Sequence, residues 1–97
     1  MSRRRKPKAQ SERIHFKRRL RERYGIRINR IAYRTLVDKV RAGNSQYLFK
    51  QSNTRAVHRI EIGDIPVTVI YDNLRSELIT ALPAHLTEED IRNYNGT

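Results

Sequence analysis

The sequence predicts an α+β domain in which two N-terminal helices pack on a four-stranded antiparallel meander sheet, followed by a short C-terminal helix. Three observations carry this prediction. Apolar residues recur at helical spacing as far as Gly43, and from Gln46 onward they fall in short runs rich in β-branched and aromatic residues. The segments between these runs are too short for a helical crossover, so successive strands should pair as hairpins. A chain of 97 residues has room for one modest core.

The first predicted helix follows a basic segment. Residues 1–10 have no apolar period and predict a disordered arm, which leaves 11–97 as a single domain. Ser11 is suited to the N-cap of the helix and Gly25 to its end, because glycine adopts positive φ readily. The apolar side chains of this helix fall largely on one side: Ile14, Phe16, Leu20 and Tyr24.

A second helix is predicted between Asn29, which can cap it, and Gly43-Asn44, which can close it. Its predicted apolar face is broad and consists of Ile31, Ala32, Leu36, Val37 and Val40.

Four strands should follow, at about 46–51, 55–62, 65–71 and 77–82. The connections are rich in Asn, Asp, Gly and Ser and are tight enough for hairpins. After the last strand, Thr87 precedes three acidic residues, which the positive end of a helix dipole favours. This pattern predicts the short terminal helix.

The positive charge is concentrated at one end of the chain. Residues 1–30 contain thirteen of the 21 Lys and Arg against two acids, and so carry the whole net charge of +11. A polyanion is therefore the expected partner. We favour nucleic acid over a membrane surface, because the first helix lacks a broad face of large apolar residues. The arm supplies five candidate cations: Arg3, Arg4, Arg5, Lys6 and Lys8.

Composition also argues against several classes of function. The chain has no cysteine, which excludes thiolate metal sites and a cysteine nucleophile and agrees with a cytoplasmic location. His, Asp and Glu do not occur at metal-ligand spacings, and four scattered glycines cannot build a phosphate loop. We therefore expect no metal and no other cofactor. No apolar run approaches the ~20 residues of a membrane helix, so a membrane partner is not expected.

The first helix carries a pattern suited to cleaving RNA. His15, Arg19 and Arg23 stand at i, i+4 and i+8 and form one stripe beside the apolar side. A histidine there can exchange protons near neutral pH, and the arginines can hold a phosphate. Such a reaction needs a base for the 2′-hydroxyl, cations for the phosphorane and an acid for the leaving oxygen. The alternative is that His15 is a helix-surface residue among phosphate-binding arginines.

The predicted sheet adds further candidates. His58 is in phase with apolar residues of its strand, and is either a partly buried core histidine or a catalytic or RNA-stacking residue. Thr80 is predicted to share a face with Leu78 and Leu82, where its hydroxyl could bond a phosphate or a local group. Three cations near the first hairpin could contact phosphates or be solvated: Lys50, Arg55 and Arg59.

Four motifs carry a resemblance to a known family: His15-x₃-Arg19-x₃-Arg23-x-Gly25-Ile26, Arg41-Ala42-Gly43, Val67-x-Val69-Ile70-Tyr71-Asp72 and Leu78-Ile79-Thr80-Ala81-Leu82-Pro83. With the order of elements, they make residues 12–84 resemble the small metal-independent RNase domains of the barnase, colicin and RelE group. The resemblance implies RNA bound across the sheet and cleavage to a 2′,3′-cyclic phosphate. It marks His15 and Thr80, with Arg19 as a phosphate ligand, and leaves the strand cation open among Lys50, Arg55 and Arg59.

Two classes of function follow. One is a metal-independent endoribonuclease that cleaves by 2′-hydroxyl attack, toxin-like or phage-encoded, acting on free or ribosome-bound RNA. It requires His15, Thr80 and a basic strand residue to converge, with His58 as a further catalytic candidate. The other is a non-catalytic RNA-, ribosome- or DNA-binding protein, which needs only the basic arm and helix. The basic helix could also bind an acidic protein, such as an inhibitor. The sequence does not indicate an oligomeric state.

Overall fold

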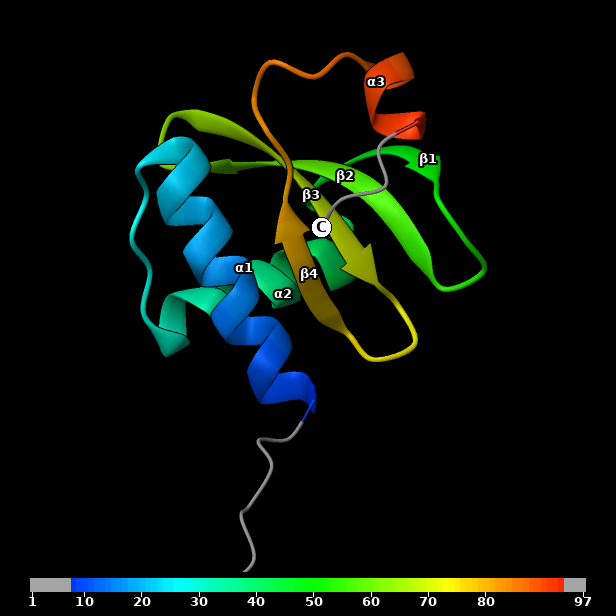
Figure 1. The fold of residues 1–97 in the computed structure, drawn as a ribbon. Helices are drawn as coiled ribbons and strands as arrows, with labels where there is room; N and C mark the ends of the chain where they lie inside the picture. Colours follow the sequence, from blue (N-terminus) through cyan, green and yellow to red (C-terminus); the bar gives the residue numbers. More distant parts are fainter. Residues whose placement is uncertain (1–7, 94–97) are drawn as a thin grey trace, which may run out of the picture.

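The computed structural model describes residues 8–93, and the side chains of residues 13–93. Helices α1 (Lys8–Tyr24) and α2 (Arg30–Arg41) precede strands β1 (Gln46–Lys50), β2 (Arg55–Ile62), β3 (Ile65–Asp72) and β4 (Glu77–Ala81), and helix α3 (Glu88–Arg92) comes last. The sheet has the order β1-β2-β3-β4, and every neighbouring pair is antiparallel. The predicted α+β meander is therefore confirmed (Figure 1).

Helix α1 begins earlier than the sequence predicted. It starts at Lys8, so Ser11 lies inside the helix and is not its N-cap. Residues 8–10 are good helix formers, and the nearest helix breaker before them is Pro7. Residues 1–7 of the predicted arm lie outside the described residues. The other end agrees with the prediction: Gly25 has a φ of 68°, and its N–H donates to the Arg21 carbonyl at 2.9 Å.

Helix α2 begins at the predicted cap but buries a different face. The Asn29 side chain accepts a hydrogen bond from the Ala32 N–H at 2.8 Å. Tyr33 is buried, whereas Ile31 is 76% exposed, contrary to prediction. Position 31 is turned by about 160° from position 33 on the helix, so both cannot face the core. The buried residues of this helix are Tyr33, Leu36, Val37 and Val40.

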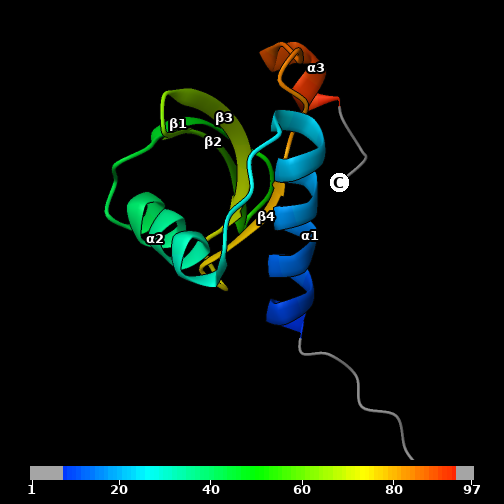
Figure 2. The ribbon, with the colours of Figure 1, turned by 90° about the vertical axis from the view of Figure 1, so that its left-hand side faces the viewer.

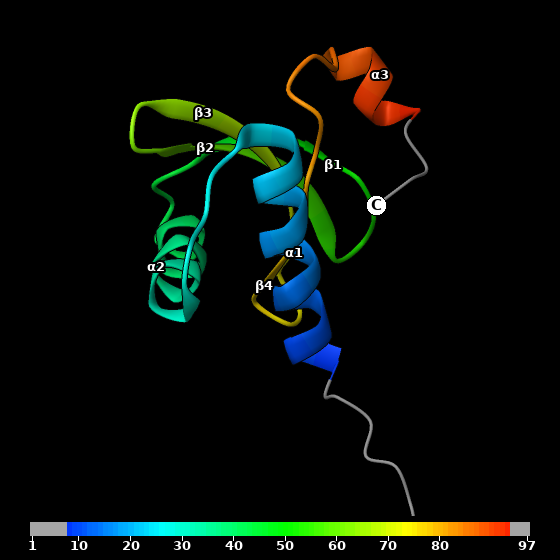
Figure 3. The same cartoon turned by 60° about the vertical axis from the view of Figure 1, so that its left-hand side comes forward.

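The sheet has a core on each face. On one face, Phe16 and Leu20 of α1 meet residues of α2 and of the sheet, among them Tyr33. The other face holds a smaller core that includes Ile70 of β3 and Ile91 of α3. Figure 2 shows α1 running alongside β4, and Figure 3 shows α2 beneath β2 and β3. The helices therefore lie at one edge and one face of the sheet.

Tyrosine hydroxyls hold the helices to the two ends of β4. The Tyr24 hydroxyl donates to the Leu82 carbonyl at 2.7 Å and accepts from the Thr68 N–H at 3.2 Å. The Tyr33 hydroxyl donates to Glu77 Oε2 at 2.8 Å and accepts from the Leu78 N–H at 3.1 Å. Each hydroxyl bonds backbone groups that the sheet would otherwise leave unpaired, which fixes α1 and α2 relative to β4.

A bulge in β4 changes the face of Thr80. The register with β3 passes from Ile70↔Thr80 to Tyr71↔Leu78, which leaves Ile79 as the extra residue. Thr80 therefore shares a face with Ile70, on the side of α3, whereas Leu78 belongs to the core under α1 and α2. The prediction that Thr80 and Leu78 share a face is wrong, because it assumed uninterrupted alternation.

Candidate nucleic-acid interface

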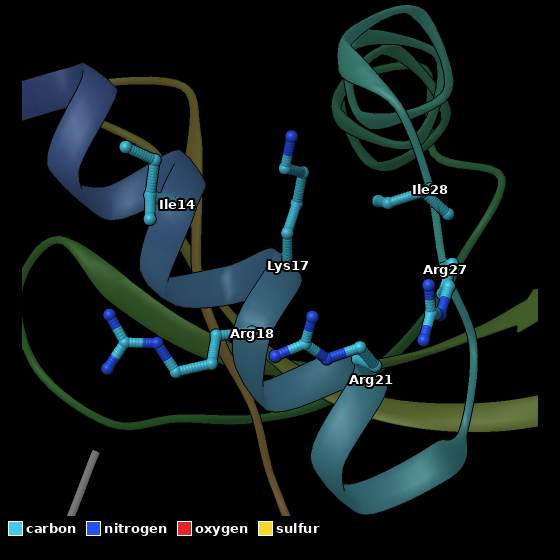
Figure 4. A pocket seen from close by; sticks show the side chains of 6 residues that line it. All are labelled: Ile14, Lys17, Arg18, Arg21, Arg27 and Ile28. Carbon is cyan, nitrogen blue, oxygen red and sulfur yellow. The ribbon is translucent and has the colours of Figure 1, made fainter.

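A basic cavity of about 340 Å³ lies beside α1. Its lining residues are Ile14, Lys17, Arg18, Arg21, Arg27 and Ile28 (Figure 4). The four from α1 stand at i, i+3, i+4 and i+7, which is one face of a helix. Four of the lining residues are cations: Lys17, Arg18, Arg21 and Arg27. None of them has an ion-pair partner among the side chains of residues 13–93. Their charge is therefore available to an external anion.

The turn at Gly25 builds this cavity. It reverses the chain after α1, so that the segment leading to α2 returns beside the helix. Ile26 and Ile28 pack against the main core and hold the segment in place. Figure 4 shows Lys17, Arg18 and Arg21 on the helix and Arg27 on the segment beside it. Cations from two parts of the chain are thus gathered in one place.

A second cavity, of about 700 Å³, lies where α1 meets the start of α2. Arg13 of α1 and Arg30 and Arg34 of α2 line it, together with Ile31, Tyr33 and Glu77. Glu77 is buried, and its carboxylate is held by Tyr33 and lies 3.9 Å from Arg34 Nη1. We refer to the two cavities together as the basic junction. Its cations are Arg13, Lys17, Arg18, Arg21, Arg27, Arg30 and Arg34.

The stripe of His15, Arg19 and Arg23 has a different environment. Arg23 Nη1 donates to the Ala81 carbonyl of β4 at 2.9 Å, and Arg19 Nη1 pairs with Glu22 at 2.9 Å. Since β4 is an edge strand, the Arg23 bond helps to cover an otherwise open edge. Part of this predicted phosphate-binding stripe therefore has a structural role.

His15 itself is half-buried on this stripe. Its Nε2 atom is buried and has no hydrogen-bond partner. Burial is the largest cause that lowers the pKa of His15 below 6.5, and Arg19, Arg18 and Arg23 lower it further, against an opposing effect of Glu22. The ring is therefore neutral at pH 7 and able to accept a proton.

His58 lies elsewhere, on the face of β2 that looks towards α2. Its Nδ1 is 2.9 Å from the Ser45 hydroxyl, and its ring contacts those of Tyr47 and Tyr71. Burial lowers the pKa of His58. This arrangement agrees with the partly buried, hydrogen-bonded histidine that was one of the two interpretations of the sequence.

Two of the predicted catalytic residues, His58 and Thr80, lie on opposite faces of the sheet. Thr80 is fully buried, its hydroxyl oxygen has no hydrogen-bond partner, and it faces the side of α3. His58 lies on the opposite face, so the sheet separates the two residues. His15 and Thr80 are not hydrogen-bonded to each other, since the relevant atom of each has no partner. A phosphate could not reach the Thr80 hydroxyl in this conformation.

The candidate strand cations are dispersed. Arg55 pairs across the strands with Asp72, with 3.4 Å between Nε and Oδ2. Lys50 is exposed at the end of β1, and Arg59 is half-buried on β2 opposite Thr68. Of the arm cations, residues 3–6 and the side chain of Lys8 fall outside the described part. The sequence interpretation missed Lys17, Arg18, Arg21 and Arg27, although the i, i+4 spacing of Lys17 and Arg21 was a usable signal.

Comparisons with family models, with curated proteins and with solved structures find no match to this chain. The resemblance to the barnase, colicin and RelE group therefore stays a prediction. Within residues 8–93, no helix is long and apolar enough to cross a membrane. The same residues contain no group of three or more His, Asp or Glu side chains placed to hold a metal ion.

Proposed function

We propose that this protein binds nucleic acid, with RNA as the expected form, through the phosphate backbone at the basic junction. The observation that carries the proposal is the cavity lined by Lys17, Arg18, Arg21 and Arg27, whose charges no described side chain neutralises. Lys and Arg without acidic partners are the groups that contact phosphates in most protein–nucleic acid interfaces. The net charge of +11 adds long-range attraction of a polyanion.

The shape of the junction supports a strand more than a single small anion. Two cavities lie along the same helix, one beside residues 14–21 and the other beside Arg13 and the start of α2. Successive phosphates could occupy them in turn, with Ile14, Ile28 and Ile31 providing apolar contact for sugars. Ribosome-bound RNA presents the same groups. An acidic protein is the competing ligand, and its binding would not require the regular spacing of phosphates.

The test measures binding of a fluorescent RNA by anisotropy over about 50 to 300 mM salt. The double variant Lys17→Ala/Arg21→Ala should lower the slope of log affinity against log salt by about 1.4 to 1.8, because each lost phosphate contact contributes ~0.7 to 0.9. The control, Lys39→Ala/Arg92→Ala, removes the same charge at residues outside the junction that are not candidate phosphate ligands, and should change the slope less. Equal slopes for the two double variants would reject the junction as the binding site.

A metal-independent endoribonuclease remains a second candidate function, and one observation favours it. His15 Nε2 is buried and unbonded on a stripe that also carries Arg19 and Arg23, and the lowered pKa keeps the ring in its neutral form, the form that can act as a base. The proposed base and phosphate ligands would then be His15 and Arg19. Thr80 is fully buried, so its hydroxyl could reach a phosphate only after a change of conformation. A cytoplasmic location remains the expectation for either function.

A further inference from the structure

A cavity of about 530 Å³ lies at the end of α2 that is remote from the basic junction. It is formed between the last turn of α2 and the face of β1, β2 and β3 that carries the larger core. Its principal lining residues are Arg41, Tyr47, His58, Tyr71, Asn73 and Ser76. None of these six lines the basic junction.

Three aromatic rings form one wall of this cavity. Tyr47 of β1 is paired with His58 of β2, and their ring centroids are 5.5 Å apart. The His58 and Tyr71 centroids are 5.9 Å apart, and both tyrosine rings stand nearly perpendicular to the imidazole. The Ser45 hydroxyl bonds His58 Nδ1 and so fixes the imidazole plane. The wall is therefore held by contacts within the protein.

Tyr47 is the accessible member of the group. Its side chain is 57% exposed, whereas Tyr71 is 6% exposed. A large ring that is exposed next to a buried one presents an aromatic surface on which a flat, apolar ligand can stack. Burial lowers the pKa of His58, so its imidazole, which lies between the two tyrosine rings, is uncharged at neutral pH. It therefore repels neither a nucleobase nor the Arg41 guanidinium.

Polar groups complete the cavity on the side of the turn between β3 and β4. Asn73 is exposed and offers both a donor and an acceptor. Ser76 has a φ of 56°, a left-handed conformation that is unfavourable for a non-glycine residue and often occurs at functional sites. The turn is held by Asp72 Oδ1, which accepts from the Leu74 and Arg75 N–H groups at 3.0 and 3.1 Å. The polar side of the cavity is therefore also held by hydrogen bonds within the protein.

We propose that this cavity binds an unpaired nucleobase, stacked on Tyr47, of a single-stranded RNA whose backbone is held at the basic junction. The inference rests on the proposed function and adds the class of ligand. The Asn73 amide can bond the edge of the base, and Arg41 can contact its phosphate. Helix α2 separates the two sites by about 18 Å, at 1.5 Å for each of its 12 residues, which a few nucleotides can span.

The experiment compares three fluorescent RNA probes of about ten nucleotides: a single strand, the same backbone with abasic riboses, and a duplex. The full-length protein should bind the single strand about 10-fold more tightly than the abasic strand or the duplex. Tyr47→Ala should abolish this preference without changing the salt slope, and Tyr47→Phe, which keeps the ring, should retain it. Ring signals of Tyr47 and His58 in NMR spectra of the wild type should shift with the single strand and not with the abasic one.

The outcomes separate this inference from the proposed function. Salt-dependent binding of all three probes with equal affinity would overturn the nucleobase site and leave the basic junction in place. No binding of any probe would overturn both. A preference for bases that survives in Tyr47→Ala would place base recognition outside this cavity. Since the NMR signals are read on the wild type, the inference can fail even if Tyr47→Ala does not fold.

Discussion

Charged side chains of the basic junction and of the sheet differ in whether they have a partner. In the junction, Lys17 and Arg21 face an open cavity and have no acidic partner among the described side chains. In the sheet, the buried carboxylates are bonded: Asp72 holds Arg55 and two backbone N–H groups, and Glu77 holds the Tyr33 hydroxyl. Unpaired charge that is exposed costs little stability and can bind an anion, whereas buried charge must be paired. The difference supports the proposal that the junction binds an external anion, whereas the paired groups of the sheet and its helix contacts contribute stability.

The largest expected effect concerns His15 of α1, which belongs to neither region. If the protein cleaves RNA, His15→Ala should reduce the rate by about 10² to 10⁴ fold, the usual contribution of a positioned acid–base group, with RNA affinity nearly unchanged. The measurement is single-turnover cleavage at equal RNA occupancy with EDTA present. His85→Ala, which alters a histidine outside the sheet and helix α1, is the control. Equal rates for wild type and His15→Ala would mean that another group is the acid–base catalyst. Cleavage that EDTA abolishes would refute a metal-independent reaction.

A smaller effect should follow from a substitution that removes a buried hydrogen-bonding group next to the sheet. Tyr33→Phe removes the hydroxyl that bonds both Glu77 Oε2 and the Leu78 N–H. Leaving a buried carboxylate and a backbone donor without their partner should destabilise the fold by about 2 kcal/mol. Urea unfolding followed by circular dichroism measures the change. Lys17→Ala, in the junction, should change stability by less than about 0.5 kcal/mol, and comparable losses in the two variants would refute the separation of stability from binding.

The sequence contained enough information for the fold, because the signals for it are local. The change from helical spacing to alternating runs predicted the order of elements, and Gly25, Asn29 and Thr87 predicted ends that the structure confirms. The errors arose where tertiary packing decides. Tyr33 is buried in place of Ile31 because its ring packs on Phe16 of α1 and its hydroxyl bonds Glu77 and Leu78 of β4.

The candidate site was less predictable for the same reason. The spacing of Lys17 and Arg21 shows that they share a helix face, but only the packed turn after Gly25 brings Arg27 beside them. Pairing of Tyr47 with His58 depends on a hairpin register that the turn residues alone do not set. The face of Thr80 depends on a bulge that interrupts the alternation on which the prediction was based.

A substitution of Thr80 tests whether its unpaired hydroxyl belongs to a catalytic site. Its hydroxyl oxygen is buried and has no hydrogen-bond partner, which costs stability unless a ligand or a movement satisfies it. Thr80→Val keeps the shape and removes the hydroxyl, so it should stabilise the fold by about 1 kcal/mol. Urea unfolding provides the measurement, and RNA cleavage is followed in parallel. Stabilisation without loss of cleavage would exclude a catalytic Thr80, whereas lost cleavage would restore it to the site.

The smallest expected effect is a pH dependence of stability that arises from His15 of α1 and His58 of the sheet. Burial is the first cause that lowers the pKa of His15 and of His58 below 6.5, so near and below that pH the unfolded chain binds more protons than the folded one. Their contribution to stability is therefore fully present above pH 6.5 and is lost as the pH falls towards the folded pKa values. Urea midpoints at about pH 7.5 and about pH 5.5 should differ less in His15→Gln and in His58→Gln than in the wild type. A midpoint difference that neither substitution reduces would mean that other groups, such as carboxylates, govern it.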